Sequence, residues 1–152
     1  MTKILPHSGF IDDTRHRFPL RVYYEDTDLG GVVYYANYLK FMERARSEML
    51  RLIGINQKQM LKFNHYEDVI FVVRHAEVDF IQSAEFDDHL VVITEIIKLG
   101  GASLVIKQDV TRNDKILVNG IIKIAAINNE GKPKKILGEL REKINLTNSN
   151  II

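Results

Sequence analysis

Hydrophobic and polar positions follow two different periods along the chain, and the change of period predicts the order of its elements. An alternating stretch, Phe18–Glu25, is typical of a strand, with Pro19 near its start where a missing N–H is tolerated. From Tyr34 to Gly54 the apolar residues instead recur at helical spacing. The chain is therefore expected to open with a loose segment, residues 1–16, followed by a strand and one long helix.

The predicted helix is unusually apolar in its first half. Its apolar stripe is made by Tyr38, Met42, Ala45, Met49, Leu52 and Ile53. Leu39 and Phe41 widen that stripe, so the first half is expected to be surrounded on most sides rather than to lie on a surface. A sheet wrapped around the helix would provide such surroundings.

Strand patterns dominate the rest of the chain. After a possible short helix, 55–63, and a polar loop, 64–68, four stretches rich in Val and Ile are predicted as strands: 69–81, 89–99, 103–112 and 116–128. Gly100-Gly101 and Asn113-Asp114 suit hairpin turns, which favours antiparallel pairing in sequence order. A short amphipathic helix, 136–144, and a disordered tail, 145–152, are expected at the end.

These elements predict an α+β fold, in which a curved antiparallel sheet wraps a long central helix. The 152 residues fit a single domain, 1–152, because no repeat or interdomain linker interrupts them.

Composition narrows the function classes. The 21 Lys and Arg residues nearly balance 20 Asp and Glu residues, so the chain lacks the basic excess expected of a nucleic-acid partner. It contains no cysteine, which excludes a disulfide framework and a thiolate nucleophile and favours a cytoplasmic location. Its apolar runs are too short for a transmembrane segment.

The segment from Arg21 to Tyr38 carries the strongest chemical signal. It places Asp26 and Asp28 before Gly30 and Gly31, and the long helix follows at once. A carboxylate beside a glycine turn at a helix start brings a base next to unpaired backbone N–H donors. Acyl transfer requires this combination of a base or nucleophile with donors for a developing oxyanion.

The same segment resembles a known family. Its Tyr-Tyr-Glu-Asp-Thr-Asp, Gly-Gly-Val-Val-Tyr and Ala-Asn-Tyr-Leu runs resemble the hotdog-fold acyl-CoA thioesterases of the 4-hydroxybenzoyl-CoA thioesterase family, above all the Tol-Pal-associated (YbgC-type) branch. Phe71-Val72-Val73-Arg74, Asp79-Phe80 and Ala84-Glu85-Phe86-Asp87-Asp88 match the family's next strand and turn. The resemblance covers most of residues 18–130.

The resemblance implies roles for particular residues. Asp28 matches the family's catalytic carboxylate, which either attacks the thioester carbonyl or deprotonates a water. The backbone N–H of Tyr35 matches the donor that polarises the thioester oxygen. Gly30 and Gly31 would let the backbone approach the substrate, and Tyr34 and Tyr38 are candidates to line an acyl pocket.

Coenzyme A carries phosphates, so cations are expected at the mouth of such a site. Arg74 is the main candidate, and Lys98, Lys107 and Arg112 are further ones. If its strand is regular, Arg74 and His75 point to opposite faces.

Other readings of these residues stay open. Asp28, taken alone, would suit a helix cap or a turn. Asp26 would suit a supporting or a solvent-exposed position. Glu43 would suit an exposed helix face, where it would pair with Arg44 and Arg46. The histidines form no metal-binding spacing, and no Gly-x-Ser-x-Gly elbow is present, so neither a metal centre nor a serine hydrolase is expected.

The resulting expectation is an acyl-CoA thioesterase that needs no cofactor and no metal. The alternatives are an acyl-carrier-protein thioesterase and a non-catalytic acyl-CoA-binding or scaffold protein. The resemblance implies a homodimer or homotetramer with active sites at the subunit interface. A second chain would complete each pocket through its segment around 64–74.

Overall fold

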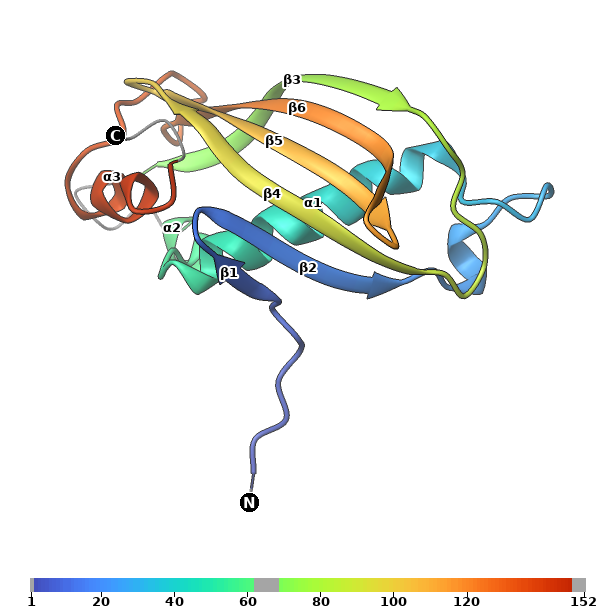
Figure 1. Ribbon diagram of the computed structural model, residues 1–152. Helices are drawn as coiled ribbons and strands as arrows, with labels where there is room; N and C mark the ends of the chain where they lie inside the picture. The colour runs from blue at the N-terminus through green and yellow to red at the C-terminus, as the bar shows by residue number, and fades with distance from the viewer. Residues whose placement is uncertain (1, 62–68, 149–152) are drawn as a thin grey trace.

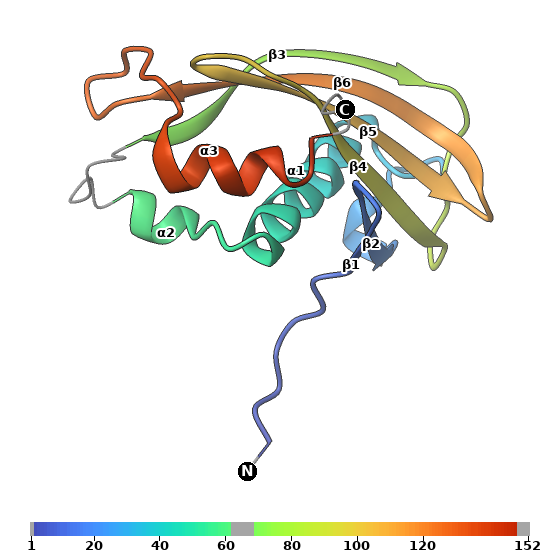
Figure 2. The ribbon, with the colours of Figure 1, turned by 60° about the vertical axis from the view of Figure 1, so that its left-hand side comes forward.

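The computed structural model describes residues 2–61 and 69–148. Within them a six-stranded antiparallel sheet curves around helix α1 (Tyr35–Leu52), as Figure 1 shows. The strands are β1 (Phe10–Asp12), β2 (Arg15–Arg21), β3 (Ile70–Phe80), β4 (His89–Leu99), β5 (Ser103–Arg112) and β6 (Lys115–Ile127). Two short helices, α2 (Gln57–Met60) and α3 (Gly138–Asn145), lie near the C-terminal end of α1 (Figure 2). The predicted α+β architecture is confirmed.

Helix α1 fills the concave side of the sheet because its apolar stripe faces inward. Its buried residues are Tyr38, Phe41, Met42, Ala45, Met49 and Leu50. Leu52, predicted to belong to this stripe, and Leu39, predicted to widen it, are instead exposed. The helix ends at Leu52, and Gly54, which was predicted to close it, follows the C-cap residue Ile53 with a φ of +89°, in the left-handed region that glycine tolerates.

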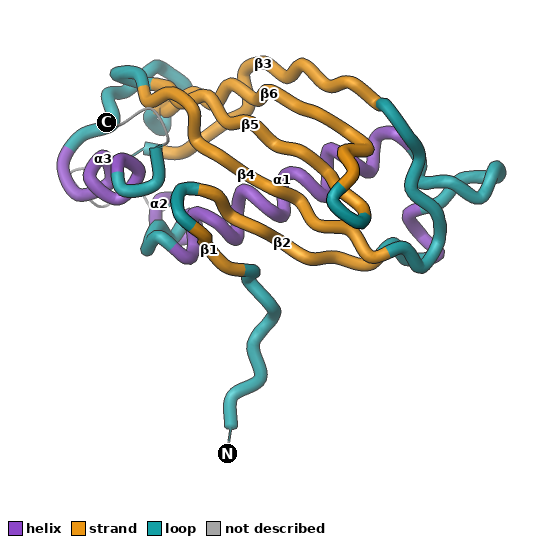
Figure 3. The backbone as a smooth tube through the Cα atoms, viewed as in Figure 1, coloured by secondary structure: helices purple, strands orange, loops and turns teal. Residues whose placement is uncertain are grey.

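The strand order is β1-β2-β4-β5-β6-β3, which corrects part of the predicted pairing. The hairpins β4–β5 and β5–β6 follow the sequence, and Asn113 and Asp114 take the positive φ values that the second turn needs. β3 pairs with β6 and not with β4, and β4 pairs with β2. The connection from β3 to β4, residues 81–88, is too long for a two-residue hairpin, so packing and not a tight turn separates these two strands (Figure 3).

The N-terminal segment is more ordered than predicted. The first long strand spans Arg15–Arg21 and not Phe18–Glu25, because the Asp26 carboxylate accepts the Tyr23 N–H at 2.8 Å and bends the chain into a 3-10 turn. Residues 10–16, expected to be loose, form β1 and the start of β2. His16 is fully buried, and its Nε2 donates to the Ser8 carbonyl oxygen at 2.7 Å.

The C-terminal segment also packs on the body. α3 buries Leu140 and Ile144, close to the predicted helix at 136–144. Disorder was predicted from residue 145, but Thr147 is buried and Asn148 forms a β-bridge with Ile96. The remainder of that predicted tail, 149–152, and the predicted loop, 64–68, lie outside the described residues.

A polar network lies inside the core between α1 and the sheet. The Gln108 amide donates to the Met42 carbonyl oxygen and to the Thr94 hydroxyl, both at 2.9 Å, and accepts from Arg46 at 2.9 Å. Burial lowers the pKa of Arg46 while the nearby Glu43 carboxylate raises it. Every described polar atom of Gln108 is thus paired, as a buried amide requires.

Candidate active site

The chain between the 3-10 turn and α1 forms a narrow loop that projects from the body, light blue in Figure 1. Thr27 and Val33 form an antiparallel bridge at its base. The Asp28 N–H donates to the Val32 carbonyl oxygen at 2.9 Å, and the Gly31 N–H donates to the Asp28 carbonyl oxygen at 3.0 Å. Gly31 takes a φ of +78°, which a residue with a side chain adopts only under strain.

The base of this loop is fastened on both sides. The Val33 N–H donates to the Ala84 carbonyl oxygen at 2.8 Å, so the segment before β4 holds one side. The Asp26 carbonyl oxygen accepts the Tyr34 N–H and the Asn37 amide, each at 2.9 Å. Asp26 is buried, so it supports the loop and is not the solvent-exposed residue that was the other possibility. A rigid base therefore positions an open tip.

The Asp28 side chain lies open at this tip. One carboxylate oxygen accepts the Gly30 N–H at 2.8 Å, and the residue is exposed to solvent. A Cβ on residue 30 would come 3.2 Å from that oxygen, so the glycine leaves room around the carboxylate. Among the described residues no cation pairs with Asp28. Its second oxygen is thus free for a water or a substrate carbon.

The N-terminal end of α1 supplies unpaired donors beside this loop. Tyr34 is the N-cap residue, yet its side chain makes no capping hydrogen bond, and no acidic residue occupies the first turn. The Tyr35 N–H finds no acceptor in the described part of the chain. The positive end of the helix is therefore open to a developing negative charge.

Aromatic side chains surround the helix start. Tyr35 is 59% exposed, and its ring packs edge-on against Phe80 at a centroid distance of 5.7 Å and against Tyr34 at 5.1 Å. Leu29 at the loop tip is fully exposed. Neither Leu29 nor Phe80 was among the predicted site residues, although Phe80 belongs to the Asp-Phe pair that supported the resemblance.

Tyr38, a predicted pocket residue, lies beneath this open surface, with its ring 5.8 Å from the Phe80 ring between their centroids. It is only 3% exposed, and its hydroxyl accepts the Ala84 N–H at 2.9 Å. Burial raises the pKa of Tyr38, outweighing the Ala84 hydrogen bond, which lowers it. Tyr38 thus holds the segment that fastens the loop.

The predicted cations differ in their surroundings. Arg74 is exposed and has no partner in the described part of the chain, and it lies at a register shift between Val73 and His75. This bulge breaks the alternation assumed for Arg74 and His75. Arg112, by contrast, donates to the Asp88 carboxylate at 2.6 Å. Burial favours a higher pKa of Asp88, but the Glu85 N–H and Arg112 outweigh it and lower that pKa.

The remaining candidates have structural partners. Glu43 accepts the Ser47 hydroxyl at 2.8 Å, and the Arg46 guanidinium donates to Gln108 in the core at 2.9 Å. The Glu43 carboxylate still interacts with Arg46 through charge, since it raises the pKa of that arginine. The described residues contain no group of His, Cys, Asp and Glu side chains able to hold a metal ion. None of the described helices is both long and apolar enough to cross a membrane.

Comparisons with known proteins place the chain in a family. Residues 30–118, which begin just after Asp28, match the model of the thioesterase superfamily. The chain is 41% identical over 124 residues to an acyl-CoA thioesterase YbgC of Haemophilus influenzae, covering 82% of this chain and 88% of that protein. It is 45% identical over 109 residues to an acyl-CoA thioester hydrolase YbgC of Escherichia coli O6:H1, covering 72% and 78%.

Solved structures agree with this placement. A probable thioesterase from Bartonella henselae superposes with a TM-score of 0.77 at 42% identity, over 81% of this chain and 99% of that one. A 1,4-dihydroxy-2-naphthoyl-CoA thioesterase from Synechocystis shares the fold with a TM-score of 0.77 at 20% identity, over 86% of this chain and 95% of that one. The chain therefore belongs to the thioesterase superfamily and is a hotdog-fold thioesterase related to the YbgC proteins.

Proposed function

We propose that the protein hydrolyses acyl-CoA thioesters at the loop between Asp28 and Tyr35. The net reaction adds one water across the thioester C–S bond and releases a carboxylic acid and free coenzyme A. The observation that carries the proposal is an open carboxylate fastened beside an uncapped helix start. The YbgC relatives, named as acyl-CoA thioesterases, support the choice of substrate.

Asp28 is the proposed general base or nucleophile. Either role requires a carboxylate oxygen that a water or a carbonyl carbon can reach, and the exposed position of Asp28 meets this need. The Tyr35 N–H is the proposed donor to the carbonyl oxygen, whose negative charge grows as the tetrahedral intermediate forms. Gly30 and Gly31 would leave the approach to the carbonyl open.

Binding of the substrate is assigned to two parts of the surface. Tyr34 and Tyr35 offer exposed rings next to the reacting carbonyl. Arg74 offers an exposed guanidinium for the phosphates of coenzyme A, with which arginine forms bidentate contacts. The proposed reaction uses no cofactor or metal, since coenzyme A is part of the substrate.

The proposal includes a homodimer whose active sites lie at the interface. β3 is an edge strand of 11 residues, most of them exposed, and an unpaired edge of this kind invites a second strand. Val73 and Phe80 on this strand are about half exposed. Pairing two copies along β3 would cover both, and two such dimers would make the alternative tetramer. A cytoplasmic location, expected from the cysteine-free composition, belongs to the same proposal.

The decisive experiment compares Asp28→Asn with wild type in thiol release from acyl-CoA esters of different lengths. We expect wild type to release thiol and Asp28→Asn to lose at least ~100-fold in rate, since it removes a general base or nucleophile. Glu25→Gln is the matched control, because it removes an exposed carboxylate three residues away.

The outcomes separate the alternatives. Equal rates for Asp28→Asn and wild type would refute the role of Asp28. If wild type releases no thiol from any acyl-CoA ester but cleaves an acyl-carrier-protein ester, the carrier-protein reading replaces this one. If it cleaves neither, the non-catalytic binding reading remains.

A further inference from the structure

The turn at residues 84–88, between β3 and β4, holds both ends of the segment 22–33, which carries Asp28. At the first end, the Val22 N–H and the Val22 carbonyl oxygen each form a hydrogen bond of 2.9 Å with the backbone of the turn. At the second end, the Val33 N–H donates to a carbonyl oxygen of the turn at 2.8 Å. Figure 1 shows the connection from β3 to β4, in yellow-green, running beside the light-blue loop. The position of Asp28 therefore depends on the position of this turn.

A partly buried ion pair ties the turn to the sheet. Arg112, the last residue of β5, donates from its guanidinium to the Asp88 carboxylate at 2.6 Å and to the Ser83 carbonyl oxygen at 3.3 Å. The same carboxylate oxygen of Asp88 accepts the Glu85 N–H at 2.8 Å, inside the turn. Hydrogen bonds between ionised groups are roughly twice as strong as those between neutral groups. The ion pair therefore fixes both the conformation of the turn and its distance from β5.

A second ion pair at the same turn provides a contrast. Arg21 lies 3.6 Å from the Asp87 carboxylate, and these two side chains are 57% and 68% exposed. The side chains of Arg112 and Asp88 are only 25% and 24% exposed. Exposed ion pairs contribute little to stability because water solvates both charges. We therefore expect the inner pair, and not the outer one, to hold the turn in place.

Any effect of the inner pair on Asp28 must pass through the backbone. In the described part of the chain, neither Arg112 nor Asp88 forms a hydrogen bond or an ion pair with Asp28. The turn instead contacts the base of the Asp28 loop through Val33, so a displaced turn would shift that base. A displacement of about 1 Å between reacting groups can lower a rate by ~100-fold.

We infer that Arg112 is a positioning residue of the active site: through its ion pair with Asp88 it holds the turn that places Asp28 against the thioester carbonyl. The inference rests on the proposed function, because it concerns the same reaction. It gives Arg112 a role different from that of a cation that binds the phosphates of coenzyme A. A phosphate ligand matters only for substrates that carry phosphates, whereas a positioning residue matters for every thioester.

Two thioesters of the same acid separate these roles. One is the acyl-CoA ester that wild type cleaves fastest, and the other is the N-acetylcysteamine ester, which has no phosphate. We expect Arg112→Gln to lower kcat/KM by the same factor, ~10–100-fold, for both esters. For the acyl-CoA ester the loss should lie in kcat, with KM within ~2-fold of wild type. Arg21→Gln is the matched control, because it breaks the exposed pair at the same turn, and should keep kcat within ~2-fold.

A double-mutant cycle tests whether Arg112 acts through Asp88. Asp88→Asn keeps an oxygen for the Glu85 N–H but removes the charge. The double variant, Arg112→Gln with Asp88→Asn, should lose no more kcat than the more impaired single variant, because both changes break the same pair. Arg112→Lys restores a cation without the planar guanidinium and should recover part of kcat.

Amide hydrogen exchange gives a readout of the loop that does not depend on turnover. The Val33 N–H should exchange faster in Arg112→Gln than in wild type, because its acceptor lies on the released turn. In Arg21→Gln the exchange rate should stay as in wild type. Both measurements use conditions in which circular dichroism shows every variant to be folded, so a loss of kcat does not reflect unfolded protein.

Different results overturn different claims. If Asp28→Asn is impaired while Arg112→Gln retains wild-type kcat/KM, the positioning role is refuted and the proposed function stands. A loss confined to the acyl-CoA ester would show that Arg112 binds phosphate instead. Additive losses in the double-mutant cycle would refute the action of Arg112 through Asp88. A wild-type protein that cleaves no thioester would refute the proposed function and, with it, the catalytic consequence of the ion pair.

Discussion

The Tyr38 hydroxyl should contribute measurably to stability, because it is the partner of a buried backbone donor. Ala84 is fully buried, and its N–H donates to the Tyr38 hydroxyl at 2.9 Å. Tyr38→Phe keeps the ring in the core and leaves that N–H without an acceptor. An unsatisfied buried donor costs about 1–3 kcal/mol. At about 2–4 °C per kcal/mol for a domain of this length, the melting temperature should fall by several degrees.

The same change should reach the active site through the loop. The Ala84 carbonyl oxygen accepts the Val33 N–H at 2.8 Å, so a displaced Ala84 would loosen the base that carries Asp28. Urea unfolding at one protein concentration, with kcat for an acyl-CoA ester, measures both effects. Tyr34→Phe is the control, because its hydroxyl makes no hydrogen bond in the described part of the chain. Equal unfolding midpoints for Tyr38→Phe and Tyr34→Phe would refute the reasoning.

Three further predictions concern the core. Burial lowers the pKa of His16 below 6.5 and outweighs the Ser8 carbonyl and the Glu48 carboxylate, which raise it. As the pH drops, the unfolded chain therefore binds a proton at this histidine before the folded protein does. The free energy of unfolding should thus fall as the pH drops below about 6.5. Urea unfolding at pH 7 and pH 5 should show a smaller acid loss in His16→Gln, and an identical loss would contradict this. A Cβ at Gly120 would clash with the Met42 Cε, so Gly120→Ala should lower the free energy of unfolding by about 1–3 kcal/mol. The loss should be smaller when Met42→Ala is also present. Additive losses in a double-mutant cycle would argue against the clash. Gln108→Leu leaves the Thr94 hydroxyl and the Arg46 guanidinium without their hydrogen-bond partner. The free energy of unfolding, measured by chemical denaturation, should therefore fall by about 1–3 kcal/mol. An unchanged value would show that the network is dispensable.

The local pattern of apolar, polar and turn residues was sufficient to predict most of the helices and strands. The strands β4 and β5 match their predicted bounds and α1 lies within two residues of its own, because each carries a long periodic run closed by turn residues. The loop that holds Asp28 was also apparent, since carboxylates, paired glycines and a helix start follow one another within a few residues. The bend after Arg21 was not foreseen, because it depends on a hydrogen bond from the Tyr23 N–H to the Asp26 side chain.

Contacts between distant residues could not be read from any periodicity. The place of Tyr38 in the core depends on Ala84, and the order at residues 10–16 depends on pairing with β2. The bulge at Arg74 appears only in the register against β6. Each of these features depends on three-dimensional packing, which overrides the local conformational preference when the buried partner lies far away in the sequence.

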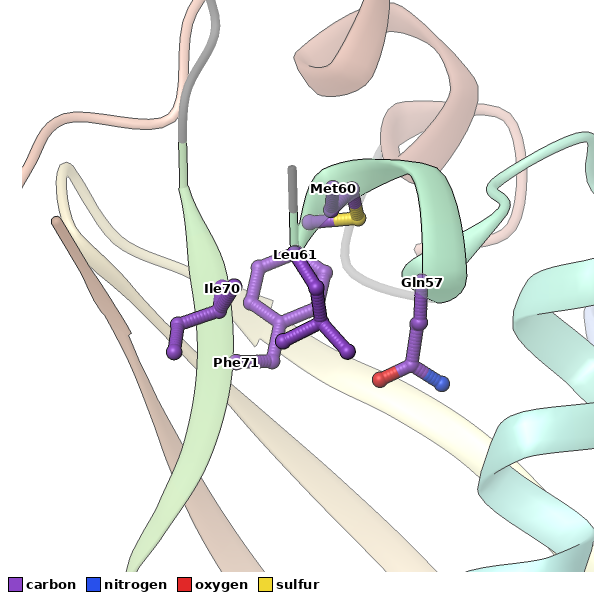
Figure 4. Close-up of a pocket in the computed structure, with 5 residues that line it drawn as sticks. All are labelled: Gln57, Met60, Leu61, Ile70 and Phe71. Atoms are coloured by element: carbon purple, nitrogen blue, oxygen red, sulfur yellow. The ribbon is translucent and has the colours of Figure 1, made fainter. Parts of the chain in front are cut away.

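The sequence by itself determined the α+β class, the long buried helix and the position of the Asp28 loop directly before that helix, because periodicity and turn residues act over a few neighbouring positions. Only the tertiary structure decided that β3 is an edge strand of the sheet and that residues of α2 and β3 line a small pocket together (Figure 4). Strand order and the position of a pocket depend on which distant surfaces pack together, and no single stretch of sequence contains that information.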